Sequence, residues 1–327
     1  MHAPISRRRA LVAVAAGGLA LPALRAQPQF PERQVRLVVP YNVGVGPDVV
    51  ARGMAENLAR LWGQPVIVDN KPGAAGIIAF GDVRRTPADG YTLFVADTAT
   101  MVVNPLINAS LPYDPERDLV PLTLLFRATF ALLVGGDSRW RSIAELLAAA
   151  RERTESVSYA SLGNGHATHV AIESMAHAAK VRFLHVPFKD AGALFTAVAG
   201  GEVDFTAFSM NTAAGLLARG KLRSLAVAAH QRLKDHPQLP TLAEAGGPAL
   251  EMRPWAGLVA VAGTPPARLQ QLQRDLVAAI DSPELRARIE PLGFELLPTT
   301  AQQFRARIDA DLALYAPLVR EGRVAQL

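Results

Sequence analysis

The chain has 327 residues, about half of them hydrophobic, and contains no cysteine, which excludes a disulfide framework, a cysteine nucleophile and a cysteine metal site. The formal charge of +5 comes mostly from residues 1–26, which hold four arginines and no acid, so the remainder carries only +1. A net charge this small argues against nucleic acid or an anionic membrane surface as a partner.

The first 26 residues have the pattern of an export signal. Arg7, Arg8 and Arg9 precede an apolar run from Ala10 to Leu24, and Ala26 is a small residue suited to a cleavage site. The run is shorter than the roughly 20 residues that a membrane-spanning helix needs. We expect cleavage after Ala26 and a periplasmic location, with general secretion and twin-arginine export both open as routes.

Strand-like apolar runs alternate with amphipathic helical segments in the rest of the chain. The first set predicts strands at 35–39, 65–68 and 91–95, with helices at 48–61 and 77–85 between them. A second set predicts strands at 156–160, 183–186, 203–207 and 222–228, with helices at 142–151, 166–179 and 193–199; further helices are expected at 267–280, 283–290 and 301–320. This order is typical of an α/β fold with helices on both faces of each sheet.

The length that remains after the leader favours two domains. The apolar stretches 122–134 and 255–261 contain no turn signal, and each is long enough to run from one sheet into the other. We therefore expect a discontinuous first domain (27–126 plus 254–327), an inserted second domain (127–253), and two hinge crossovers beside a cleft.

The loop from Tyr41 to Asp48 leaves a predicted strand and opens a predicted helix. Gly44 and Gly46 allow a backbone to approach a ligand closely, and Asp48 is expected as the N-cap. The helix start would then attract an anion. A dinucleotide site, with Asp69 ending the next strand, is an alternative, but Val49 replaces the third glycine of that fingerprint. A plain structural turn is the other alternative.

The loop from Ser161 to His169 has the same arrangement. Its glycines precede a predicted helix, and two helix starts facing one another would form a carboxylate receptor without an arginine. His166 and His169 have a spacing that also suits a metal, although no acid lies between them. His185 is expected as a hydrogen-bonded core or rim residue.

Catalytic motifs are absent from the sequence. There is no G-x-S-x-G elbow, no Walker loop and no H-E-x-x-H pair. An exported hydrolase remains an alternative, and the pattern favours a binding protein.

A series of motifs resembles the Bug-type substrate-binding proteins of tripartite tricarboxylate transporters. They occur in order over nearly the whole chain after the leader, at 38–41, 63–66, 70–73, 89–93, 104–105, 111–115, 159–165, 185–189, 220–223, 240–246 and 255–265. The resemblance implies a periplasmic-binding-protein type II fold, also called a Venus flytrap. It would close on a small organic carboxylate and deliver it to an integral-membrane permease, as a monomer without cofactor or metal. A solute sensor of the same fold is an alternative.

The resemblance also implies which loops bind the solute. The corresponding residues are Tyr41, Asn42, Val43, Gly44, Val45, Thr98, Ala99, Thr100, Gly165, His166, Thr168 and His169. This chain departs from the family pattern at Asn42, Val43, Val45, His166 and Ala167, and at Phe208, where relatives often have an aspartate. With Phe208 included in the site, we expect a solute with an apolar or aromatic body. The alternative is that Phe208 points into the domain core and His166 into solvent.

Overall fold

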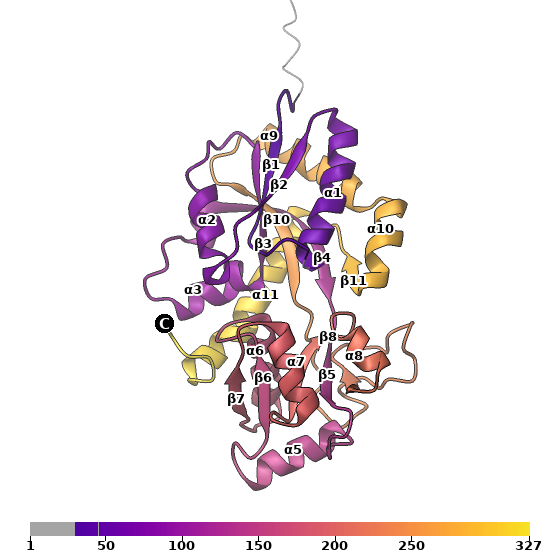
Figure 1. The fold of residues 1–327 in the computed structure, drawn as a ribbon. Helices are drawn as coiled ribbons and strands as arrows, with labels where there is room; N and C mark the ends of the chain where they lie inside the picture. The colour runs from indigo at the N-terminus through magenta and orange to yellow at the C-terminus, as the bar shows by residue number, and fades with distance from the viewer. Residues whose placement is uncertain (1–29, 45) are drawn as a thin grey trace, which may run out of the picture.

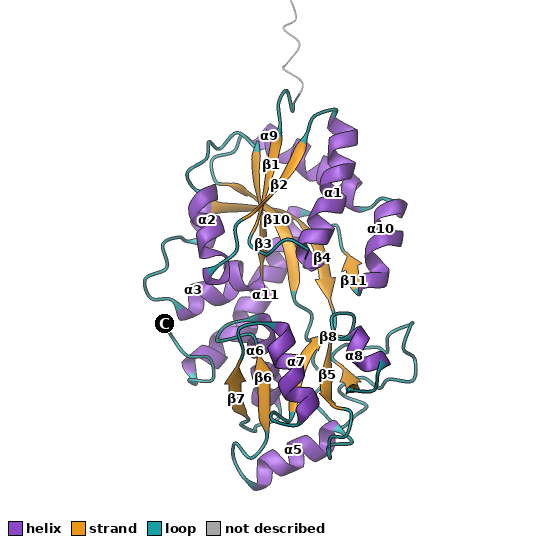
Figure 2. Ribbon diagram, viewed as in Figure 1, coloured by secondary structure: helices purple, strands orange, loops and turns teal. Residues whose placement is uncertain are grey.

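The computed structural model describes residues 30–44 and 46–327. The predicted export signal and Val45 lie outside the described residues. Two β-sheets stand one above the other, with helices packed around each of them (Figures 1 and 2). The α/β class expected from the sequence is confirmed, and the sheets contain both parallel and antiparallel pairs.

The first sheet has six strands. Their order is β11 (Phe294–Leu296), β4 (Leu119–Ala128), β10 (Trp255–Val261), β3 (Thr92–Asp97), β1 (Val35–Val39) and β2 (Val66–Asn70). The strands β1, β2 and β3 are parallel, as predicted, whereas β10 is antiparallel to β3. The carboxyl ends of β1 and β3 therefore present their loops at one edge of the sheet.

Helices cover both faces of the first sheet because its strands are apolar on both sides. The core on one face contains residues of α1 (Gly46–Trp62), α9 (Pro266–Ile280) and α10 (Pro283–Ile289). The other core contains residues of α2 (Ile77–Val83) and α11 (Ala301–Arg320). Short helical segments occur at η1 (Ala74–Gly76), η2 (Ala99–Val103), α3 (Asn104–Ile107), α4 (Pro115–Asp118) and η3 (Glu290–Leu292).

The second sheet has five strands in the order β7 (Leu184–Pro187), β6 (Ser158–Ser161), β8 (Phe205–Ser209), β5 (Phe130–Gly135) and β9 (Leu222–Val227). Residues of α5 (Ile143–Glu152) and α6 (Ala167–Ala178) pack on one face. Residues of α7 (Ala191–Gly200) and α8 (Ala214–Ala218) lie in the cluster on the other. The parallel strands β6 and β8 carry the loops of interest at their carboxyl ends.

The chain passes between the sheets at two places that lie side by side. The first passage joins β4 to β5 at Thr129, within the apolar stretch predicted for it. The second was predicted at 255–261, but this stretch is entirely β10 of the first sheet. The second passage instead precedes β10: the amide of Ala128 donates to the carbonyl of Pro254 at 2.9 Å, and the amide of Phe130 donates to that of Met252 at 3.1 Å.

The C-terminal segment packs against elements that belong to both sheets. Leu318 and Val324 share one apolar cluster with Val103 and Ile107 after β3 and with Val170 on α6. Arg323 forms an ion pair with Glu173 of α6 at 3.5 Å. The end of α11 thus lies beside the second sheet (Figure 1), although its first turns pack on the first. Among the described residues, no helix is long and apolar enough to cross a membrane.

Candidate functional site

Loops from both sheets meet at the carboxyl ends of β1, β3, β6 and β8. A Cβ atom at Gly165, after β6, would lie 2.7 Å from Ile107 Cδ1, in the segment that follows β3. The side-chain amide of Asn211, after β8, donates to the carbonyl of Pro291 at 2.9 Å. Tyr41 of the loop 41–48 bonds to Asp97, whose carboxylate in turn acts on the pKa of His166 in the loop 161–169, so these two loops lie in the same region.

The first loop is held by Asp48, although not as predicted. Asp48 lies inside α1, which begins at Gly46, and does not cap the first turn. Its buried carboxylate accepts the amide of Gly44 at 2.8 Å, Nδ2 of Asn70 at 2.8 Å and Nε of Arg52 at 2.9 Å. These bonds lower its pKa although burial opposes the shift. The Asp48 carboxylate therefore already supplies an anion at the start of α1.

The tip of the first loop is exposed. Asn42, Val43 and Gly44 face solvent, Val43 with 70% of its surface exposed. Tyr41 precedes them, and its hydroxyl donates to Oδ2 of Asp97, which joins the loop to β3. Burial raises the pKa of Tyr41 well above its usual value, and the Asp97 carboxylate adds to the shift, so the phenol stays protonated.

The loop after β3 is fixed by bonds between Asp97 and Thr100. The hydroxyl of Thr100 accepts the amide of Asp97 at 2.8 Å, and the amide of Thr100 donates to Oδ1 of Asp97 at 2.8 Å. Thr98 lies between them and is only 3% exposed, but its buried hydroxyl has no hydrogen-bond partner among the described residues. Ala99, which begins η2, is half-buried. Thr98 is therefore the one predicted hydroxyl that is free for a solute.

The start of α6 is capped by an imidazole. Nδ1 of His166 accepts the amide of Thr168 at 3.2 Å and lies 3.0 Å from its hydroxyl. Because Nδ1 is an acceptor, the proton of the neutral ring is on Nε2. Burial lowers the pKa of His166, and the Asp97 carboxylate across the site opposes that shift. The amides of His169 and Val170 bond to the carbonyl of His166, so the described residues leave only the Ala167 amide of the first turn without a partner.

His169 holds the loop 161–169 in position. Its Nδ1 accepts the amide of Gly165 at 3.1 Å, and its ring stacks on that of His185 at 4.1 Å. The side chain is 2% exposed, and burial together with the two neighbouring histidines lowers its pKa to about 3. His169 is therefore a neutral positioning residue beneath the site, and Thr168, also buried, accepts the amide of Leu162.

The sequence alternatives of a metal site and a hydrolase concern the histidines of this region. The described residues contain no group of three potential metal ligands among His, Asp and Glu. A serine–histidine pair that the spacing did not reveal does exist, since Oγ of Ser161 lies 2.6 Å from Nε2 of His185. Ser161 is fully buried, however, and the hydroxyl also accepts the amide of Gly163. The pair has the distance of a nucleophile and its base, and its serine hydroxyl also holds the loop in place.

Asp69, the acid of the alternative dinucleotide site, is bound by cations of the chain. It pairs with Arg36 at 3.0 Å and with Lys71 at 3.6 Å. Its position at the end of β2 is thus explained by ion pairs within the first sheet.

Phe208 belongs to an apolar cluster of the second sheet. Its ring lies 4.9 Å from that of Phe195 on α7 and 6.0 Å from that of Phe130, and 9% of its surface is exposed. The structure therefore places most of this side chain in the core, whereas the sequence analysis included it in the site. The polar neighbour at this end of β8 is Asn211, which is bonded to Pro291 and which the sequence analysis did not identify.

The segment around Phe294 is another part of the site region that the sequence analysis missed. A Cβ atom at Gly46 would lie 2.1 Å from the Phe294 ring, and one at Gly293 would lie 2.6 Å from Nδ2 of Asn211. Both glycines thus allow the loops after β1 and β8 to approach the segment before β11. The glycines at 46 and 293 are the sequence signal for this contact.

Comparison with known proteins agrees with this architecture. The family model of the tripartite tricarboxylate transporter family receptor matches residues 50–323. A curated relative, the "UPF0065 protein in tcbD-tcbE intergenic region" of Pseudomonas sp. (strain P51), is 34% identical over 296 residues, which cover 90% of this chain and 88% of the relative.

Two solved structures are similar in fold and sequence. One is described as "R. palustris Rpa4515 with adipate" and has a TM-score of 0.80 at 30% identity, covering 91% of this chain and all of the other. The second, "MatC (Rpa3494) from Rhodopseudomonas palustris with bound malate", has a TM-score of 0.75 at 28% identity, covering 88% of this chain and 99% of the other. This chain therefore belongs to the receptor family of the tripartite tricarboxylate transporters, whose members are periplasmic solute-binding proteins.

Proposed function

We propose that this protein captures a small organic carboxylate between its two sheets, at the loops that follow β1, β3, β6 and β8. The observation that carries the proposal is the buried Thr98 hydroxyl, which has no hydrogen-bond partner in the described part of the chain and lies in one of the loops that meet there. A buried hydroxyl without a bond costs free energy, so such a group is a candidate donor for a ligand.

Two further donors support a carboxylate at this place. The Ala167 amide has no partner among the described residues at the start of α6, where the helix dipole favours an anion. Nε2–H of His166 points from the same helix start because Nδ1 is used for capping. The relatives whose structures carry adipate and malate make dicarboxylates the first solutes to test.

The Asp97 carboxylate limits how close a solute anion comes to β3. Its oxygens accept hydrogen bonds from Tyr41 and Thr100, so it is held in place and does not turn away. We therefore infer that the solute carboxylate binds at the α6 end of the site. The exposed Val43 and the methyl group of Ala167 favour an apolar body over a hydroxylated one.

The proposed mechanism is closure of two domains, 27–126 plus 254–327 and 127–253, around the solute. The adjacent passages at 128–130 and 252–254 would act as the hinge, and the solute stabilises the closed state by touching both domains. We further propose that the mature protein acts as a monomer in the periplasm and delivers the solute to an integral-membrane permease.

Calorimetry with matched solutes tests the carboxylate. Adipate, its diamide and malate would be titrated into mature protein that has been unfolded and refolded to remove bound solute. We expect adipate to bind at least about tenfold more tightly than the diamide, because a hydrogen bond to a charged group contributes ~1.5–3 kcal/mol. Equal affinities for adipate and the diamide would contradict the proposal.

The natural solute would come from mass spectrometry of small molecules released when freshly purified protein is denatured. A carboxylic acid in stoichiometric amount supports the proposal, and an amine or sugar without a carboxylate contradicts it. A solute sensor would release the same carboxylic acid, so this measurement does not separate sensing from transport. Pull-down from the cell envelope does: a permease would indicate transport, and a receptor kinase would indicate sensing.

A further inference from the structure

A pocket of about 610 Å³ lies on the second sheet beside its edge strand β9, and its size is in the range of small-molecule sites. Residues 223–225 of β9 line one side, and the segment 238–240 lines another. That segment bonds to the end of β9, where the amide of Val227 donates to the carbonyl of Pro240 at 2.9 Å. The pocket therefore lies between the edge strand and this segment.

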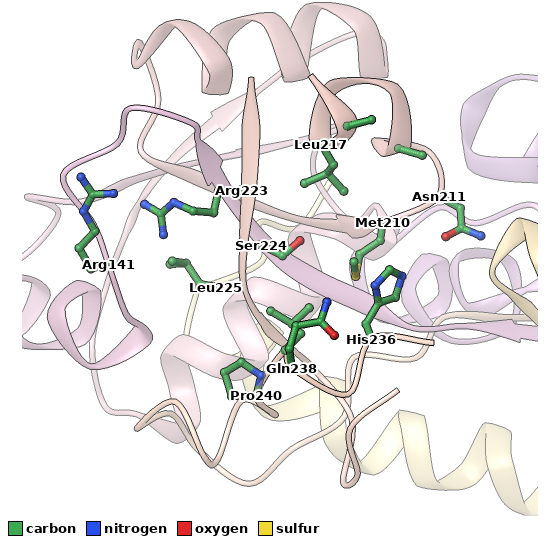
Figure 3. Close-up of a pocket in the computed structure, with 13 residues that line it drawn as sticks. Arg141, Met210, Asn211, Leu217, Arg223, Ser224, Leu225, His236, Gln238 and Pro240 are labelled. Atoms are coloured by element: carbon green, nitrogen blue, oxygen red, sulfur yellow. The ribbon is translucent and has the colours of Figure 1, made fainter. Parts of the chain in front are cut away.

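Two arginines stand together on one side of this pocket. Arg223 of β9 and Arg141, before α5, direct their guanidinium groups toward the same region (Figure 3). Among the described residues, no carboxylate lies within ion-pair distance of either guanidinium group. Glu145, whose charge acts on Arg223, accepts the backbone amide of Arg141 at 2.7 Å. Two neighbouring cations without an ion-paired acid favour an anion between them.

The guanidinium of Arg223 is already oriented. One of its terminal nitrogens donates to the carbonyl of Trp140 at 2.8 Å, while its buried Nε has no partner among the described residues. The guanidinium group is therefore fixed by its bond to the backbone, and its Nε–H remains an unused donor. A group that is already oriented lowers the entropic cost of binding a carboxylate. Burial and the neighbouring Arg141 lower the pKa of Arg223, and the Glu145 carboxylate opposes that shift.

The remainder of the pocket is mostly apolar. Met210, Leu217 and Leu225 line it, and the buried hydroxyl of Ser224, on the opposite side of β9 from the arginines, has no described partner (Figure 3). A ligand that fits this arrangement has a carboxylate at one end and an apolar body that passes the edge of β9. We propose that this pocket is a second binding site, for a small organic monocarboxylate with an apolar body, separate from the site between the sheets.

The test uses benzoate as the probe and the methyl group of Met210 as the reporter. Met210 lines the pocket, whereas Met54, Met101, Met175 and Met252 are at most 3% exposed in the cores. In methyl NMR of protein labelled at methionine, we expect benzoate to shift the Met210 signal saturably and to leave the four core signals in place. Benzamide should bind at least about tenfold more weakly, because it lacks the charge.

Substitutions inside and outside the pocket test where benzoate binds. Arg141→Gln removes an exposed cation, and we expect it to weaken benzoate binding at Met210 about tenfold or more. Arg139→Gln is the matched control, since Arg139 lies over the ring of Trp140 and does not line the pocket. Arg223→Met should abolish the shift, and Thr98→Val should leave it unchanged because Thr98 belongs to the other site.

The outcomes decide between a second site and none. Absence of a saturable Met210 shift, equal binding of benzoate and benzamide, or full affinity in Arg141→Gln would each overturn the proposal. Loss of the shift in Thr98→Val would mean that Met210 only reports occupation of the site between the sheets. Because Met210, Arg141 and Arg223 are not among the residues of that site, failure here leaves the proposed function to be judged by its own titrations.

Discussion

At the scale of single residues, two threonines of one loop have opposite roles. Thr100 has its hydroxyl and amide bonded to Asp97 and so maintains the loop. Thr98 has a buried hydroxyl with no described partner and so contributes nothing to the fold through that group. A group that is buried but unused by the fold is where a solute contact is expected.

The pair yields a matched prediction. Thr98→Val should weaken solute binding about tenfold while the unfolding temperature stays the same or rises, since a valine removes an unsatisfied hydroxyl. Thr100→Val should lower the free energy of unfolding by roughly 1–3 kcal/mol, because it leaves polar groups of Asp97 without partners. Titration calorimetry and denaturant unfolding measure the two effects. Full affinity in Thr98→Val would exclude this hydroxyl as a ligand donor.

At the scale of elements, the start of α6 rests on a stack of neutral rings. His169 supports Gly165 and stacks on His185, and Tyr159 lies 5.0 Å from the His185 ring in the same stack. The hydroxyl of Tyr159 donates to Glu173, which pairs with Arg323 of the C-terminal segment. The loop that carries His166 is thus tied to the core and to the end of the chain.

This stack predicts a loss of stability in acid. The pKa of His169 is about 3 in the folded protein and about 6.5 in the unfolded chain. Between these values the unfolded state binds the extra proton, so the contribution is fully present above pH 6.5 and is lost as the pH falls toward 3. For one such histidine the loss at pH 5 is roughly 2 kcal/mol.

Urea unfolding at pH 7 and pH 5 checks this prediction. The amide oxygen of His169→Gln accepts from Gly165 without titrating, so the difference between the two pH values should shrink by roughly 2 kcal/mol relative to the parent. Glu173 is present in both proteins and cancels in the comparison. His230→Gln, at an exposed histidine, should behave as the parent. An unchanged pH dependence in His169→Gln would show that His169 is protonated in the folded state.

At the scale of the whole molecule, the passages between the sheets share an ionic cluster. Arg127, at the end of β4, binds Glu295 through two nitrogens at 2.7 and 2.8 Å, and Arg253, beside the second passage, binds the same carboxylate. One acid thus joins both passages to β11. Such a cluster would keep the proposed hinge in register while the sheets turn relative to each other.

Much of this arrangement was predictable from local patterns. Apolar runs such as 35–39 predicted the buried strands, and the stretch 122–134 predicted the first passage because no turn residue interrupts it. The second passage was misplaced because Trp255–Val261 is just as apolar although it stays in one sheet. Periodicity reports burial and not the sheet in which a strand pairs.

The site was predictable in its loops and less so in its side chains. The glycines near 44 and 165 indicated where the backbone turns. The prediction of Asp48 as an N-cap was wrong, because its carboxylate binds the side chains of Arg52 and Asn70. Phe208 lies in the core because Phe195 of α7 packs against it, a contact that depends on the tertiary fold. Asn211 and Phe294 were missed since they come together only across the two sheets.

The central claim is that a carboxylate solute draws the two sheets together. The chain has no cysteine, so replacing Leu61 on α1 and Lys189 before α7, both exposed, by cysteine gives one spin label on each side. Pulsed electron paramagnetic resonance then measures the distance between the labels with and without saturating adipate, and with its diamide as the control. We predict a shorter, narrower distance distribution with adipate alone. An unchanged distribution at a concentration where calorimetry shows full occupancy would contradict closure around the solute.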